Sequence, residues 1–235
     1  MEEQKQKIRI MTWNLGQFIW MRLVGRFFPI HGNKNRYQNY NKGNSQVIKN
    51  IISEIKPDIF IAQELEKNTV ISDFWEGDES IHFSPSYYRH FQKLYIGKEK
   101  GKSVFLKNHK ELTIIELEKF IIFSVHLNAF SAKKRYEEIN SICDLSKSYE
   151  KPIICLGDFN LWKHGDLFLF KYDYLAYKKI SQYFNYATRD ISYTTPIGFS
   201  LDNIFTKKIT IKNAGIIYEN GLYMDHYPIY LDFEI

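Results

Sequence analysis

The stretch IICLGDFNLW, residues 153–162, is an apolar run that ends in a carboxylate and a carboxamide, Asp158 and Asn160. Other apolar runs of the sequence also end in polar residues: Asn14, Glu64, His126 with Asn128, Asp202, and Asp225 with His226. One asparagine or aspartate at the end of a strand is most often a turn residue. A set of such residues at several strand ends indicates more than turns, because ligand-binding and catalytic residues gather where strand ends meet on one face. We therefore expect these residues to form one site.

The acidic members of this set favour a hard metal ion. Glu64, Asp158 and Asp225, together with Asn14, offer oxygen ligands without any thiolate. Such a set suits Mg²⁺, or Mn²⁺, better than zinc. Because Mg²⁺ usually takes one or two carboxylates and keeps several waters, a further carboxylate is left to orient a water nucleophile.

The two histidines complete a hydrolytic set. His126 and His226 are able to hydrogen-bond a phosphoryl oxygen or to move a proton. Asp202 is placed to hold one imidazole in a chosen tautomer, as a carboxylate does in hydrolase triads. The sequence contains neither a glycine-rich phosphate loop nor a serine-hydrolase elbow. These observations favour hydrolysis by a metal-activated or carboxylate-oriented water.

The elements that must position these residues follow from hydrophobic periodicity. We expect strands over 8–13, 59–63, 103–107, 112–117, 120–127, 152–157, 202–211 and 228–235, and helices over 45–56 and 133–149. The strands at 112–117 and 120–127 are separated by two residues, which indicates an antiparallel hairpin. Two sheets packed face to face with helices outside fit this pattern better than a doubly wound parallel sheet. Cys143 and Cys155 lie in apolar patterns, and we expect buried free thiols.

The bulk composition is that of a globular protein. The chain has 235 residues, 44% hydrophobic and 25% charged, and shows no repeat or linker, which favours a single domain over residues 1–235. The start resembles no signal peptide and no stretch is long enough to span a membrane, so we expect a cytoplasmic protein. The net charge is +5, and no acidic residue occurs from Met11 through Ser53. Such a basic stretch attracts phosphate, although a solvated basic loop explains it equally well.

The polar strand ends lie in motifs that resemble those of the endonuclease/exonuclease/phosphatase superfamily. The matching motifs are TWN (12–14), PDIFIAQE (57–64), SVHL (124–127), GDFN (157–160), SLDNIF (200–205) and MDHYPI (224–229), in the order found in the family. The resemblance implies a four-layered α/β sandwich, in which two mixed sheets pack face to face between helices. It also implies that the site lies at one end of the strands.

The resemblance assigns roles to individual residues. It implies that Glu64 is the principal Mg²⁺ ligand, that Asn14 lies near the metal and bonds the catalytic aspartate, and that Asp225 is a further metal or water ligand. A second group is implied to act on the substrate: Asp158 orients or deprotonates water, Asn160 positions the phosphate, His126 and His226 stabilise charge on phosphorus, and Asp202 orients His226.

The substrate is expected to be an anionic phosphoester. Residues 17–42 form a long insertion in which aromatic and basic residues alternate, and Arg22, Arg26 and Arg36 are candidate substrate-binding residues together with Asn128. This composition suits nucleic acid, slightly ahead of phospholipid, and an ordinary packed helix remains an equal alternative. We therefore predict a nuclease. The alternatives are a phospholipid phosphodiesterase, an inositol or nucleotide phosphatase, and a non-catalytic binding module. No segment indicates a protein partner, and we expect a monomer.

Overall fold

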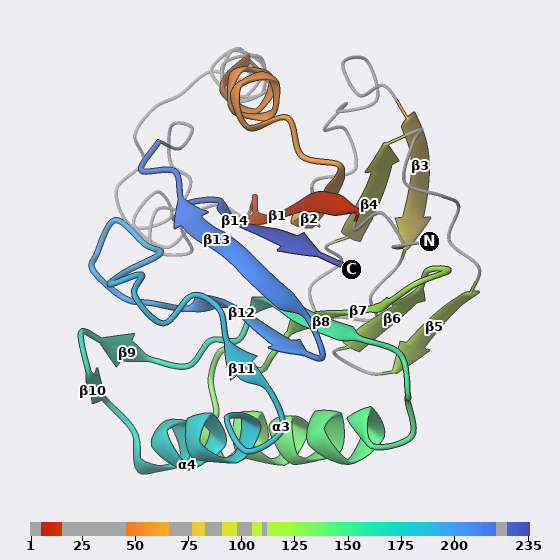
Figure 1. The fold of residues 1–235 in the computed structure, drawn as a ribbon. Helices are drawn as coiled ribbons and strands as arrows, with labels where there is room; N and C mark the ends of the chain where they lie inside the picture. Colours follow the sequence, from red (N-terminus) through yellow and green to blue (C-terminus); the bar gives the residue numbers. More distant parts are fainter. Residues whose placement is uncertain are drawn as a thin grey trace.

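A computed structural model describes seven parts of the chain: residues 6–15, 46–65, 77–82, 91–97, 105–109, 112–219 and 225–235. Within these residues, two six-stranded sheets dominate the fold (Figure 1). The first sheet has the strand order β13-β14-β1-β2-β4-β3. Its strands are β1 (Lys7–Asn14), β2 (Ile59–Leu65), β3 (Gly77–His82), β4 (Phe91–Gly97), β13 (Thr210–Ile216) and β14 (Ile229–Glu234).

The second sheet has the order β11-β12-β8-β7-β6-β5. Its strands are β5 (Phe105–His109), β6 (Leu112–Glu116), β7 (Ile121–His126), β8 (Ile153–Asp158), β11 (Asn185–Tyr186) and β12 (Asp202–Lys207). Both sheets are mixed, because β1 pairs with β2 and β7 pairs with β8 in parallel, whereas their other pairings are antiparallel. A two-stranded ribbon, β9 (Lys163–His164) with β10 (Leu167–Phe168), stands apart from both sheets.

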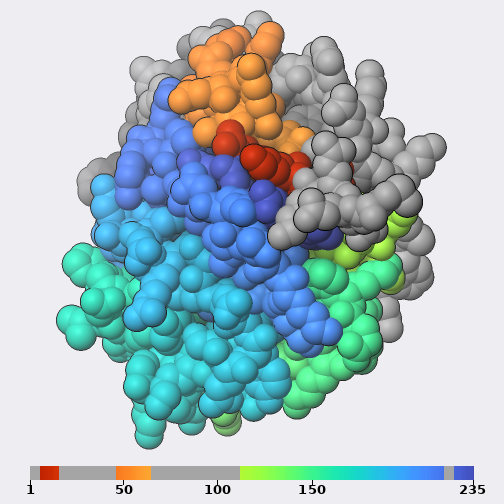
Figure 2. Space-filling view, viewed as in Figure 1, coloured from red at the N-terminus to blue at the C-terminus, as the bar shows by residue number. Residues whose placement is uncertain are grey.

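Strand alternation sorts the apolar side chains into three layers of core. In β1, Ile8 and Ile10 face the second sheet, whereas Met11 and Trp13 pack on the opposite side against the helix over residues 46–55. Neighbouring side chains of a strand point to opposite faces, so one apolar run serves two cores. The second sheet is covered on its outer face by α3 (Ala132–Ser146) and α4 (Lys171–Ile180). The order is therefore helix, sheet, sheet, helix, as expected for a four-layered α/β sandwich (Figure 1). In Figure 2 the orange segment with the helix over 46–55 lies at the top, and the green and teal segments with α3 and α4 lie at the bottom.

The periodicity-based helices are confirmed in type, with small differences in their bounds. The helix over 46–55 buries Ile48, Ile51, Ile52 and Ile55. It ends where Lys56 adopts a left-handed φ of 49°, directly before Pro57. The helix expected over 133–149 is α3, whose first turn is capped by the Ser131 hydroxyl accepting from the Lys134 N–H.

The prediction of a single strand over 202–211 is wrong. This segment consists of β12 and β13, which belong to different sheets. Between them Lys208 has a φ of 57°, a left-handed conformation that breaks the extended chain. The pattern nevertheless reads as continuous, because Ile209 just after the break is itself buried in the core between the sheets. The chain thus crosses from one sheet to the other within two residues.

Both cysteines are buried free thiols, as expected. Burial raises the pKa of Cys143 to about 12 and holds that of Cys155 well above its usual value. Among the described residues, no helix combines the length and apolar character needed to cross a bilayer.

Candidate active site

The second sheet brings three predicted site residues into one row. His126, the last residue of β7, is paired in register with Asp158, the last residue of β8. On the other side of β8, Asp158 is in register with Asp202, the first residue of β12. The parallel strands end at the same edge of the sheet, so an imidazole and two carboxylates follow from strand pairing alone. Asp158 and Asp202 are both buried.

The first sheet contributes Asn14 and Glu64 to the same edge. The Asn14 amide Nδ2 donates to Glu64 Oε1 at 3.1 Å and to Asp158 Oδ2 at 3.0 Å. One buried side chain therefore bridges the carboxylates of two sheets. Asn14 thus lies beside the catalytic aspartate, and its role as a metal ligand remains a prediction.

Gln63 is a second bridge between the sheets, and the sequence analysis assigned it no role. Its Nε2 donates to the Val125 carbonyl at 2.6 Å, and its Oε1 accepts from the Asp158 N–H at 3.1 Å. Gly157 makes room for this contact. It has a φ of 132°, and a Cβ there would lie 2.3 Å from Gln63 Nε2 and 2.2 Å from the Val125 carbonyl oxygen. The glycine of the GDFN motif thus allows the two sheets to approach.

His226 enters the site from the segment that precedes β14. Its Nδ1 lies 2.7 Å from Asp202 Oδ2, and its Nε2 lies 3.9 Å from Asp158 Oδ2. The backbone is held as well, because Trp13 Nε1 donates to the His226 carbonyl at 3.0 Å. Burial acts to lower the pKa of His226, but the carboxylates of Asp202, Asp158 and Asp225 outweigh burial and hold the pKa well above its usual value. These carboxylates therefore favour the protonated form of the imidazole.

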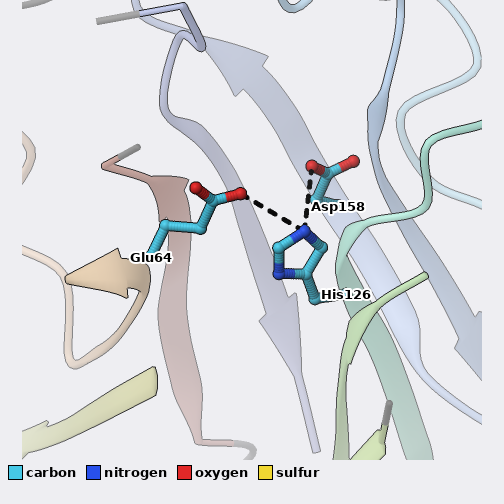
Figure 3. A group of neighbouring side chains, drawn as sticks. All are labelled: Glu64, His126 and Asp158. Atoms are coloured by element: carbon cyan, nitrogen blue, oxygen red, sulfur yellow. Dashed lines mark ion pairs between the residues drawn. The ribbon is translucent and has the colours of Figure 1, made fainter. Parts of the chain in front are cut away.

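His126 lies on the other side of Asp158, facing Glu64 across the boundary between the sheets (Figure 3). Its Nε2 is 3.3 Å from Glu64 Oε1 and 3.8 Å from Asp158 Oδ2. One ligand atom from each of Glu64, His126 and Asp158 lies within 4.8 Å of the other two. That spacing, with two carboxylates and one imidazole, fits a single metal ion.

Two carboxyl groups of the site, those of Asp158 and Asp225, carry raised pKa values. Burial raises the pKa of Asp158, with Asp202 adding to the rise and the imidazole of His226 opposing it. Burial also raises the pKa of Asp225 to about 6, opposed by His226 and reinforced by the Glu64 carboxylate. The carboxyl groups of Glu64, Asp158, Asp202 and Asp225 all lie within 4 Å of His126 or His226, which concentrates negative charge at this edge. A divalent cation would neutralise it, in agreement with the oxygen-rich donor set.

Asn160 is buried beside Asp158 with a left-handed φ of 49°. Its backbone N–H donates to Asp158 Oδ1 at 2.9 Å, so this carboxylate is held from two directions, by Asn160 and by Asn14. The Asn160 Nδ2 donates to the Leu127 carbonyl at 3.0 Å. Its contact with a substrate phosphate remains a prediction.

The expected substrate-binding residues are not brought together in the same way. The Asn128 side-chain oxygen accepts from the N–H groups of Phe130 and Ser131, and so shapes the turn before α3. This contact is structural, and it gives no support to the predicted substrate contact. Arg22, Arg26 and Arg36 lie outside the described residues.

The sequence analysis did not predict a buried ion pair between α3 and α4. Arg135 of α3 binds Asp173 of α4 through two contacts of 2.8 Å, and both side chains are almost completely buried. Arg135 also donates to the carbonyl of Asn128 at 2.8 Å, and Asp173 accepts from the Trp162 N–H at 3.2 Å. The pair therefore ties together the loops that follow His126 and Asn160.

We predict that Arg135→Met destabilises the protein by about 3–5 kcal/mol, because it leaves the Asp173 carboxylate buried without its partner. The double variant Arg135→Met with Asp173→Leu recovers most of this loss, since no charge is then stranded. Urea unfolding of the single and double variants measures both values.

The exposed pair of Lys147 and Asp144 is the matched control for this experiment. Asp144→Ala leaves the unfolding midpoint unchanged within error, because water screens a surface pair. A midpoint equal to that of the wild-type protein for Arg135→Met would contradict the assignment.

Comparison with solved structures places this fold among known ones. An endonuclease/exonuclease/phosphatase from Bacteroides vulgatus matches with a TM-score of 0.72 and 18% identity, covering 98% of this chain and 100% of that chain. An endonuclease/exonuclease/phosphatase family protein from Bacteroides thetaiotaomicron matches with a TM-score of 0.71 and 14% identity, covering 99% of each chain. The human Nocturnin catalytic domain with bound sulfate matches with a TM-score of 0.64 and 18% identity, covering 98% of this chain and 96% of that domain.

No family model matches the sequence, and no curated protein matches it either. The resemblance to solved structures nevertheless extends over nearly the whole chain. It confirms the endonuclease/exonuclease/phosphatase fold that the motifs predicted, an α/β sandwich of two mixed sheets.

Proposed function

We propose that this chain, which has the endonuclease/exonuclease/phosphatase fold, is a metal-dependent phosphoester hydrolase. The observation that carries the proposal is the convergence of Glu64, His126 and Asp158 with the His226–Asp202 pair at one edge of the two sheets. Oxygen ligands for a metal ion, a carboxylate that can accept a proton from water and an imidazole that can donate to a phosphoryl oxygen are groups suited to phosphoester hydrolysis by water.

Glu64 is the residue proposed to hold the metal ion, with Asp158 and Asp225 as the further carboxylates near it. Mg²⁺ is the favoured ion and Mn²⁺ also suits this donor set. When bound, such an ion polarises a phosphoryl oxygen and neutralises charge that develops in the transition state.

The remaining catalytic roles are proposed for three side chains of the protein. Asp158 is proposed to orient the attacking water and accept its proton, because the N–H groups of Asn14 and Asn160 fix both of its oxygens. His226, oriented by Asp202, presents Nε2 toward the site and donates to a phosphoryl oxygen. His126, on the opposite side of Asp158, is proposed to help stabilise the charge that develops on phosphorus.

The choice of substrate among the phosphoesters is a separate proposal. The sequence favours a nuclease because of the basic and aromatic residues of 17–42, which lie outside the described residues. A phospholipid phosphodiesterase and a phosphomonoesterase use the same groups at the reacting phosphorus, so substrate choice depends on what surrounds the site.

The test is a substrate panel with the purified full chain. Plasmid DNA, RNA, phospholipid vesicles, a soluble phosphodiester and a soluble phosphomonoester are incubated with Mg²⁺, with Mn²⁺ and with EDTA. We expect hydrolysis of at least one diester with either metal and none with EDTA. Release of free phosphate from a monoester alone would instead indicate a phosphatase.

One outcome would contradict the proposal. Tight binding of DNA in EDTA with no turnover of any phosphoester in either metal would identify a non-catalytic binding module on the same fold.

A further inference from the structure

Gln63 and Glu64 are consecutive residues of β2, yet both side chains reach residues of the second sheet. The Gln63 Nε2 lies 2.6 Å from the Val125 carbonyl oxygen, and the Glu64 Oε1 lies 3.3 Å from His126 Nε2. Regular strand alternation sends neighbouring side chains to opposite faces. The first four residues of β2 follow this rule and alternate between the core between the sheets and the outer core: Ile59 and Ile61 in the former, Phe60 and Ala62 in the latter. By the same rule Glu64 would point away from the second sheet, and it does not.

The backbone at Glu64 accounts for this exception. Glu64 has a left-handed φ of 53°, and the register of β2 with β4 shifts between Ala62 and Leu65. A β-bulge of this kind re-aims a side chain toward the other face of a sheet. The Glu64 carboxylate is thereby turned toward His126 and Asp158 (Figure 3). A glutamate rarely adopts a left-handed conformation, and such strain persists only where the surrounding structure holds it in place.

Gln63, directly before the left-handed residue, is fixed by both sheets. In the first sheet it is in register with Asn14, and its carbonyl accepts from the Leu15 N–H at 2.9 Å. In the second sheet its side chain donates to the Val125 carbonyl and accepts from the Asp158 N–H at 3.1 Å. Gln63 is completely buried, so water does not replace these bonds when they are lost. The start of the bulge is therefore held at one position relative to β7 and β8.

The contacts of Gln63 link the two carboxylates that the candidate metal site needs. Glu64 follows Gln63 in the chain, and Asp158 is bonded to the Gln63 side chain through its backbone N–H. The Gln63 Nε2 faces the Val125 carbonyl and its Oε1 faces the Asp158 N–H, so the amide is turned to the backbone of β7 and β8. Gln63 therefore acts on the site through its neighbours.

We propose that Gln63 is the positioning residue of the candidate metal site: by tying the bulge at Glu64 to the second sheet, it holds Glu64 and Asp158 at the spacing that one metal ion needs. Removal of a residue that supports metal ligands without touching the metal typically lowers metal affinity by about 10–100-fold. The inference rests on the proposed function for the presence of the ion, and it adds the residue that sets the geometry of the ligands.

The experiment is calorimetric titration of the metal-free full chain with Mn²⁺, which measures binding without turnover. Glu64→Gln, which removes a ligand charge, identifies the binding that belongs to this site. Gln63→Met is expected to weaken Mn²⁺ binding at this site by about tenfold or more. Methionine has nearly the same size as glutamine, but it bonds neither the Val125 carbonyl nor the Asp158 N–H. Circular dichroism shows whether each variant is folded.

Gln63→Asn is the second variant, and it replaces Gln63→Met if the latter does not fold. Asparagine keeps the amide, but its side chain is one methylene shorter and does not reach β7 and β8 together. A loss of Mn²⁺ affinity is expected for this variant as well.

Two controls separate positioning from the loss of a hydrogen bond alone. Gln46→Met makes the same exchange at an exposed glutamine, whose Nε2 donates to Asn50 Oδ1 at 2.8 Å. Ser146→Ala removes a buried bond of 2.8 Å from the Ser146 hydroxyl to the Cys143 carbonyl, in the last turn of α3. Both controls are expected to bind Mn²⁺ with the wild-type affinity, even where Ser146→Ala lowers the unfolding midpoint.

The outcomes separate this inference from the proposed function. Wild-type affinity for Mn²⁺ in the Gln63 variants would overturn the positioning role and leave the metal site in place. Equal weakening by Ser146→Ala, or failure of both Gln63 variants to fold, would also overturn it, because Gln63 would then serve stability alone. Absence of Mn²⁺ binding by the wild-type protein, or binding that Glu64→Gln leaves unchanged, would contradict the proposed metal site itself and the inference with it.

Discussion

Asp158→Asn is expected to lower the hydrolysis rate by about 10³-fold or more while the protein remains folded. The carboxamide has nearly the same shape, but it cannot accept a proton from water at neutral pH. The side chain is buried, and the N–H groups of Asn160 and Asn14 approach its two oxygens. The substitution thus changes the chemistry of the group more than its packing.

Asp158→Asn should change the free energy of unfolding of the metal-free protein only slightly. Asparagine loses one of these two hydrogen bonds, which costs about 1 kcal/mol. Against this, burial raises the pKa of Asp158 in the folded state. A carboxyl with a raised folded pKa favours folding only at low pH, and this contribution is lost as the pH rises through the folded pKa. At neutral pH the ionised group is therefore unfavourable to folding, and its removal offsets the lost bond.

The measurement pairs initial rates on the soluble diester with urea unfolding in EDTA. Asp166→Asn is the matched control, because Asp166 is an exposed carboxylate in the turn between β9 and β10. It should keep the wild-type rate. Hydrolysis by Asp158→Asn at the wild-type rate would remove Asp158 from the mechanism.

Gly157→Ala is expected to destabilise the fold by more than about 3 kcal/mol. The new Cβ would lie 2.2 Å from the Val125 carbonyl oxygen and 2.3 Å from Gln63 Nε2, and the φ of 132° is unfavourable for alanine. Relief would require β7 and β8 to separate or Gln63 to give up its contacts with both strands. Each response disturbs Asp158, which follows Gly157 directly.

Gly165→Ala isolates the contribution of the backbone angle. Gly165 also has a positive φ, 56°, but a Cβ there meets no atom within 4 Å. Gly165→Ala should lower the free energy of unfolding by about 1 kcal/mol, which is the cost of placing an alanine in the left-handed conformation. Comparison of the two midpoints in urea gives the cost of the close approach, and equal midpoints would show that Gly157 is not needed for it.

Hydrophobic periodicity was sufficient to predict most of the layered fold. The strands ending at Asn14, His126 and Asp158 are buried runs bounded by polar residues, and the helix over 46–55 shows its buried isoleucines at helical spacing. Periodicity failed at Lys208, because the residues on both sides of the turn are apolar or strand-forming although they belong to different sheets. The ribbon of β9 and β10 is two residues long in each strand and carries no periodic signal.

The candidate site was predictable in its members but not in their contacts. Polar strand ends and ordered motifs pointed to Glu64, Asp158 and His226, which the structure places at one edge. The bonds of Gln63 to Val125 and Asp158 span 62 and 95 residues, and the pair of Arg135 and Asp173 spans 38. No local pattern specifies such contacts, because they depend on how the layers pack. Arg135 lies in the first turn of a helix that the sequence analysis predicted, but nothing in the sequence pointed to Asp173 as its partner.

The bridge that Asn14 makes between Glu64 and Asp158 couples chemistry to the spacing of the layers. The two carboxylates belong to different sheets, so the distance between them is set by the thickness of the apolar layer that separates the sheets. Protein interiors are dense and transmit strain. Ile10, Ile61 and Leu156 belong to this layer, and we expect the size of their side chains to affect the separation of the two carboxylates. Under the proposed function, smaller or larger side chains there are expected to change the hydrolysis rate at temperatures where the fold itself is still intact.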